Sequence, residues 1–132
     1  MTPRFGIDTS ILVRLATGLP DADFQRTLSE LKGRVEAGTA EFFASNLVVA
    51  EAFMVLRHHY SATADDSRAA LHSVLSSGLV SPVHGLSVRT ALERGREPGL
   101  VDRLIVIDYG HHAMETLTLD RRMAGLPDAR LL

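Results

Sequence analysis

The sequence predicts a single α/β domain spanning residues 1–132, with a short parallel sheet flanked by helices. Two observations carry this prediction. Short apolar segments alternate with longer segments in which apolar residues recur at steps of three and four. Strands that alternate with such helices are typical of a parallel sheet covered by helices. The second observation is size, because 132 residues, of which 45% are hydrophobic, suit one domain with a single substantial core.

The first half of the chain divides at clear start and stop signals. Thr9 and Ser10 supply capping residues after one short apolar segment, and Ser45 or Asn46 does so after another. Gly38 ends an amphipathic segment. We therefore expect strands at 5–7 and 41–45, helices at 9–16 and 23–36, and a helix that follows Ser45 or Asn46 and carries Glu51.

The second half shows the same alternation. Thr63 gives a start signal and Gly78 a stop signal for a helix within 61–77. Pro82 lies in the next apolar segment, and an edge strand tolerates proline because its missing N–H is not needed there. We therefore expect a strand at 79–83. After it we expect a helix at 85–94, a break at 95–99, a helix at 100–107, a strand at 115–119, one helical turn at 121–124 and a strand at 130–132.

Composition excludes several classes of protein. The chain has 14 basic and 16 acidic residues, a formal charge of −2, which argues against a broadly basic coat for nucleic acid. It has no cysteine, so disulfides and thiolate zinc sites are excluded. The N-terminus lacks the apolar stretch of a signal peptide, and no segment is long enough for a membrane helix. We expect a soluble, cytoplasmic protein.

Glu51 is the only charged residue in the apolar segment 47–56. A helix that is apolar all round is expected to be buried, and a buried carboxylate costs several kcal/mol unless it is neutralised, paired or bound to a metal. An ion pair with Arg14 or Arg57, or exposure at one edge of the helix, is the simpler explanation.

Three aspartates lie where elements are predicted to begin or end: Asp8, Asp102 and Asp120. Each of them, taken singly, also suits a helix cap or first turn. Asp8 and Asp120 follow strands, and ligands of parallel sheets gather beyond the carboxyl ends of the strands. With Glu51 they make four acids, which cannot all stay ionised at neutral pH without a cation if they lie together, so the pattern indicates a divalent metal site.

The segments around these acids resemble the four acidic motifs of PIN-domain nucleases. They occur in family order and extend over nearly the whole chain, as Gly6-Ile7-Asp8-Thr9-Ser10-Ile11-Leu12, Val49-Ala50-Glu51, Val101-Asp102-Arg103-Leu104-Ile105 and Thr118-Leu119-Asp120. Among these nucleases, the small single-domain bacterial form is usually the VapC toxin of a VapBC toxin–antitoxin pair. The resemblance implies a PIN-like three-layer fold and an endoribonuclease neutralised by a VapB-like antitoxin.

The resemblance also assigns roles to residues. It makes Asp8, Glu51, Asp102 and Asp120 the catalytic, metal-binding carboxylates, and Ser10 and Thr118 the hydroxyls that support them. It further implies homodimers, for which we expect the helices at 23–36 and 63–77 to form the surface. Arg103 directly follows the third acid, where many members of the family have a small or apolar residue. Asp108 adds an acid six residues after Asp102, and we interpret it as a solvent or capping residue.

The chemistry follows from the residue types. Carboxylate oxygens suit Mg²⁺ or Mn²⁺, which can lower the pKa of a bound water and stabilise charge as the water attacks phosphorus. Such cleavage of RNA would leave a 5′-phosphate and a 3′-hydroxyl. The candidates for binding RNA phosphates are the arginines near the acids, although ordinary surface arginines fit as well: Arg14, Arg103, Arg121 and Arg122.

Other functions remain open on the sequence. The six histidines have no metal-ligand spacing, and we interpret them as surface or helix-end residues. A catalytically weak PIN-like domain that binds RNA or protein is the main alternative. A phosphatase of the doubly wound type also places an aspartate after its first strand, but it needs a second aspartate or a lysine, and Lys32 is the only lysine here.

Overall fold

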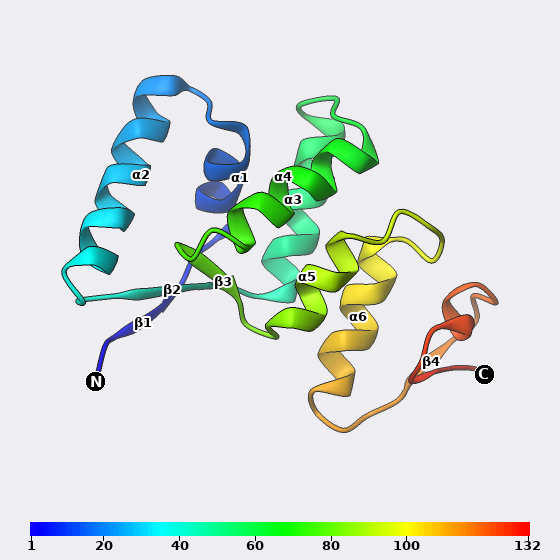
Figure 1. The fold of residues 1–132 in the computed structure, drawn as a ribbon. Coiled ribbons are helices and arrows are strands. Elements are labelled where there is room, and N and C mark those ends of the chain that lie inside the picture. The colour runs from blue at the N-terminus through cyan, green and yellow to red at the C-terminus, as the bar shows by residue number, and fades with distance from the viewer.

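The computed structural model describes all 132 residues and has an α/β architecture (Figure 1). Six helices, one 3-10 turn and five short strands follow one another along the chain. Every predicted element is present, with ends that differ by a few residues. In order they are β1 (Arg4–Gly6), α1 (Thr9–Thr17), α2 (Asp21–Glu36), β2 (Glu41–Ala44), α3 (Asn46–His58), α4 (Ala64–Leu75), β3 (Val80–Pro82), α5 (Leu86–Leu92), α6 (Leu100–Gly110), β4 (Thr116–Thr118), η1 (Met123–Gly125) and β5 (Ala129–Leu131).

Local signals in the sequence set the helix ends. The side chains of Asp8, Ser45 and Thr63 accept hydrogen bonds from backbone N–H groups in the first turns of α1, α3 and α4. Such bonds satisfy donors that have no partner inside the helix. Gly18 ends α1 in the left-handed conformation, with φ of 68°, which favours glycine. These caps determine where α1, α3 and α4 begin and where α1 ends.

The strands form two separate sheets rather than the one sheet that the alternation predicts. β1, β2 and β3 pair in parallel in that order, and β4 pairs in parallel with β5 only. β3 is an edge strand, which confirms the position expected from Pro82. Figure 1 shows β4 beyond α6, on the opposite side of the helices from β1. The C-terminal strands therefore do not extend the main sheet.

The core lies between the three-stranded sheet and the helices. Leu12, Val49, Leu71, Val80 and Val88 are fully buried, one from each of five elements. α4 packs against α1, α3 and α5, while Asp65, Asp66, Ala69 and Ser73 are exposed, so the dimer surface expected on this helix stays a prediction. The longest helix, α2, has 16 residues, and none of the helices has the length and apolar content to span a bilayer.

Candidate metal centre

Asp8 lies just after β1 and caps α1. Its Oδ1 accepts hydrogen bonds from Ser10 Oγ (2.6 Å), Ser10 N (3.1 Å) and Ile11 N (3.4 Å). The Ser10 hydroxyl and the Ile11 N–H are the main causes that hold the pKa of Asp8 below its usual value of 3.8. The side chain is therefore a carboxylate at neutral pH, and its Oδ2 has no protein partner and is free to accept a ligand.

Glu51 is exposed, so the prediction that the apolar segment buries it is wrong. α3 buries a single stripe, formed by Val49, Ala52, Phe53 and Leu56. The opposite face carries Glu51 together with apolar side chains that the core does not need, among them Leu47, which is 77% exposed. Glu51 forms no ion pair with any basic residue, so its carboxylate is not neutralised within the protein.

The helices α1 and α3 bring Asp8 and Glu51 into one cavity. α1 packs against α3, and the two carboxylates, far apart in the sequence, line a cavity of about 510 Å³ between them. Arg14, one of the predicted phosphate contacts, lines the same cavity and forms no ion pair. The other residues of its wall are Thr9, Ser10, Val13, Leu19, Pro20, Val55 and Tyr60.

This donor set suits a hard divalent cation. Mg²⁺ is commonly held through one or two carboxylates, with water and substrate phosphate filling the remaining positions. Asp8 offers a free oxygen, and Glu51 is unpaired beside the same cavity. No group of three or more acidic, histidine or cysteine side chains is arranged to hold a metal. The fold therefore brings two of the four predicted ligands, Asp8 and Glu51, to one cavity.

Asp102 and Asp120 lie near each other, and neither lines the cavity of Asp8 and Glu51. Asp102 lies in the first turn of α6, where burial raises its pKa above 3.8, with added repulsion from Asp120 and then Glu97. Asp120 follows β4, and its Oδ1 accepts hydrogen bonds from Arg122 N (2.8 Å) and Met123 N (3.2 Å). Thr118 Oγ1 accepts a bond from Asp120 N (3.0 Å), so this hydroxyl orients the backbone at the acid.

Of the other predicted phosphate contacts, none lies in the Asp8 cavity. Arg103 Nε donates to the carbonyl of Pro98 (2.9 Å), so this side chain ties the 95–99 segment to α6. It lines a different cavity of about 820 Å³ beside α5 and α6. Arg121 and Arg122 are exposed, follow Asp120 in the C-terminal segment and form no ion pair.

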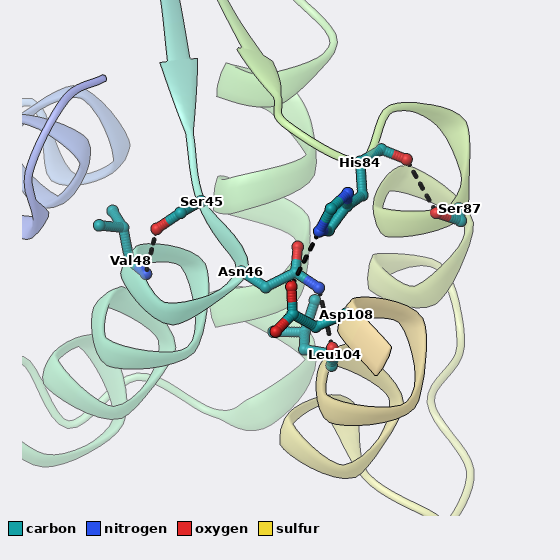
Figure 2. A network of polar contacts seen from close by, with 7 residues as sticks. All are labelled: Ser45, Asn46, Val48, His84, Ser87, Leu104 and Asp108. Atoms are coloured by element: carbon teal, nitrogen blue, oxygen red, sulfur yellow. Dashed lines mark hydrogen bonds and ion pairs between the residues drawn. The ribbon is translucent and has the colours of Figure 1, made fainter. Parts of the chain in front are cut away.

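One polar network was not predicted. His84 Nε2 lies 2.9 Å from Asp108 Oδ1 (Figure 2). The His84 ring also stacks on His111, with ring centroids 4.0 Å apart. The His84 side chain is only 14% exposed, and the residue directly precedes Gly85, the N-cap of α5, so it is a helix-end residue and not a surface one. The Asp108 side chain is 55% exposed, which agrees with its interpretation as a solvent residue, and it contacts His84 in place of capping a helix. No local pattern could reveal the pair, because its members lie 24 residues apart.

Asn46 reinforces the same junction. It is buried at the start of α3, and its Nδ2 donates to the carbonyl of Leu104 in α6 at 2.8 Å (Figure 2). The network therefore connects α3, the segment before α5, and α6, with no contact to the Asp8 cavity. We interpret it as structural.

Comparisons of the chain with protein-family models, curated proteins and solved structures gave no match. A function can therefore be proposed only from the residues and their arrangement.

Proposed function

We propose that the protein is a Mg²⁺-dependent endoribonuclease with a PIN-like three-layer fold, the toxin of a type II toxin–antitoxin pair of the VapBC kind. Mn²⁺ is the alternative metal. The observation that supports this most is the cavity between α1 and α3, which is lined by Asp8 with a free Oδ2, by the unpaired Glu51 and by the unpaired Arg14. Metal-dependent phosphodiester cleavage needs carboxylates that hold the cation and a positively charged side chain nearby that binds phosphate.

Each residue of the cavity has a role in this proposal. Asp8 and Glu51 hold the cation, and Ser10 fixes the orientation of the Asp8 carboxylate through its short hydrogen bond. Arg14, which lines the same cavity, would bind an RNA phosphate. The metal, when bound, supplies an activated water and stabilises the charge that develops on the phosphate. Asp102 and Asp120, which do not line the cavity, are the remaining acids of the set that the resemblance implies.

The test is cleavage of single-stranded RNA with Mg²⁺, with Mn²⁺ and with EDTA. We expect EDTA to abolish cleavage, and Asp8→Asn and Glu51→Gln each to lower it by at least about a hundredfold, because each removes a charged metal ligand without changing size. Glu36→Gln is the matched control, since Glu36 is exposed and lies on α2, outside the cavity. Cleavage that survives EDTA, or that both active-site variants retain, contradicts the proposal.

A catalytically weak domain that binds RNA or protein is the second candidate. It is favoured by one specific observation, the separation of Asp102 and Asp120 from the Asp8 cavity. The two candidates differ in a cell, because expression of an active toxin alone arrests growth and Asp8→Asn removes the arrest. A folded wild-type chain that leaves growth unchanged supports the binding module. For the antitoxin, the proposal expects a small neighbouring gene that encodes a DNA-binding fold with a basic, apolar tail.

A further inference from the structure

A cavity of about 820 Å³, larger than the one at Asp8, lies outside the candidate metal centre. Its volume is within the range of sites that hold small molecules. The helices α5 and α6, which pack side by side, form its two long walls, and residues 126–128 of the C-terminal segment form a third (Figure 1). Neither Asp8 nor Glu51 lines this cavity, so any ligand here occupies a separate site.

The two ends of the cavity differ in chemistry. His84, just before α5, contacts Asp108 near the end of α6, so the two helices run in opposite directions. Arg94 and Arg103 therefore lie together where α5 ends and α6 begins, whereas His111 follows α6 at the other end. At about 1.5 Å per residue, α6 rises by about 12 Å between Arg103 and His111. A ligand that fills the cavity must reach from a charged end to an aromatic one.

The arginine end carries positive charge that no acid neutralises. Neither Arg94 nor Arg103 forms an ion pair, and the single acid of the wall, Asp128, pairs with neither. Arg103 Nε donates to the carbonyl of Pro98 (2.9 Å), which fixes the direction of its guanidinium group. The Thr90 hydroxyl lies on the same wall. Two guanidinium groups and a hydroxyl suit the dianion of a phosphate monoester, whereas a carboxylate needs only one arginine.

The opposite end presents an aromatic ring whose orientation is fixed. The His111 ring stacks on His84 with centroids 4.0 Å apart, and Asp108 holds His84 at 2.9 Å. One face of His111 is thus covered within the protein, and the other is available to a flat ring. Ser87 Oγ donates to the carbonyl of His84 (2.9 Å), so its oxygen can still accept a hydrogen bond (Figure 2). A planar heterocycle with N–H groups fits both residues.

The middle of the cavity is apolar with one acidic group. Ala91 and Val106 are buried in its floor, whereas Leu86 beside them is 71% exposed and would lose water contact when a ligand binds. The carboxylate of Asp128 can accept hydrogen bonds from hydroxyl groups. A ribose presents both C–H surface and hydroxyls. The cavity therefore offers partners for a phosphate, a sugar and a base.

We propose that the cavity between α5 and α6 binds a nucleoside monophosphate unit, with its phosphate at Arg94 and Arg103 and its base on His111. The unit is either a free nucleotide or one nucleotide of an RNA strand, since both present the same groups. The site stands independently of the proposed nuclease, because it shares no residue with the Asp8 cavity.

Calorimetric titration of the whole chain with AMP in EDTA tests the site without the candidate metal centre. We expect a Kd below about 1 mM for AMP, and binding at least about tenfold weaker for inorganic phosphate and for adenosine, because each of these probes keeps only part of the contacts. AMP that does not bind overturns the proposal. Phosphate or adenosine that binds as tightly as AMP also overturns it, because one end of the cavity then takes no part.

Substitutions at each end separate the two contributions. Arg94→Gln should weaken AMP at least about tenfold and leave adenosine unchanged, because it removes one of the two charges that face the phosphate. Arg96→Gln is the matched control, since Arg96 is exposed and lies outside the cavity. His111→Ala should weaken AMP and adenosine by the same factor. Equal AMP affinity in the wild type and in Arg94→Gln contradicts the proposed phosphate site.

Amide NMR of the wild type locates AMP without any substitution. AMP should shift the signals of Thr90 and Gly110, which line the cavity, and leave the signal of Gly38, beyond the end of α2, unchanged. Shifts confined to Thr9 and Ser10 would place AMP in the Asp8 cavity and overturn the proposal.

A short single-stranded RNA distinguishes the two sources of the nucleotide. RNA that displaces AMP in EDTA, and binds more weakly to Arg94→Gln, identifies the strand as the ligand and the cavity as an anchor for RNA. RNA that leaves AMP bound identifies the free nucleotide. If the wild type never cleaves RNA, the proposed function fails, and the AMP titration still decides this site.

Discussion

Asp8 combines two roles that substitution can separate, because it caps α1 and also lines the candidate metal site. Asp8→Ala removes the acceptor of both backbone N–H bonds and should lower the free energy of unfolding by about 1 kcal/mol. For a domain of this size that is about 3 °C in Tm. Asp8→Asn keeps an acceptor oxygen and should lower stability by less than about 0.5 kcal/mol, because asparagine caps about as well as aspartate. Both variants should lose cleavage.

The contribution of Asp8 to stability should also depend on pH. The hydrogen bonds lower the pKa of Asp8 in the folded state below 3.8, so its contribution to stability is present above that value and is lost as pH falls through the folded pKa. Asp8→Asn should lack this acid-side loss. Urea unfolding at pH 7 and at lower pH measures both differences. Thr63→Ala is the matched control, since it removes an equivalent cap from α4 and should keep full cleavage. Asp8→Ala as stable as the wild type, or Asp8→Asn as unstable as Asp8→Ala, would refute the reasoning.

Three further predictions concern other parts of the chain. Glu51→Gln should leave the metal-free Tm almost unchanged, since the side chain is exposed and unpaired. It should reduce the stabilisation by Mn²⁺, which for the wild type is expected to be about 2.7 kcal/mol at 100 times the Kd. An equal Mn²⁺ response in both proteins would mean that Glu51 is not a ligand. Leu71→Ala should lower the free energy of unfolding by about 2 to 5 kcal/mol in urea, because Leu71 is fully buried in the core, and a loss below about 1 kcal/mol would contradict that packing. Burial raises the pKa of Asp102 in the folded state, so the contribution of this residue to stability declines as pH rises through that pKa. The free energy of unfolding of the wild type, minus that of Asp102→Asn, should therefore fall between pH 4 and pH 7. A difference that stays constant over this range would contradict the burial.

Local chemistry explains why the elements could be predicted from the sequence. Asp8, Ser45 and Thr63 each cap the helix that follows, and Gly18 ends α1, so the signals and the structure they cause lie within a few residues of each other. Asp8 at a junction of strand and helix was predicted for the same reason. The presence of Ser10 beside its carboxylate follows from a spacing of two residues.

Long-range arrangement could not be predicted in the same way. Strand pairing joins distant segments, and strands of three residues such as β4 carry too little pattern to fix a neighbour, so two sheets replaced the single predicted one. Apolar composition did not reveal which face of α3 is buried, and Glu51 lies on the exposed one. The pair formed by His84 and Asp108 has no local signal at all.

The end groups of the RNA product test the central claim most directly. Attack by a metal-activated water does not use the 2′-hydroxyl of RNA, so it leaves a 5′-phosphate and a 3′-hydroxyl. Cleavage of a defined RNA by the wild type with Mg²⁺, followed by mass spectrometry of the fragments, measures these groups. We predict a 5′-phosphate and a 3′-hydroxyl, with no cleavage in EDTA or by Glu51→Gln. Fragments that end in a 2′,3′-cyclic phosphate and form equally well in EDTA would contradict a metal centre at Asp8 and Glu51.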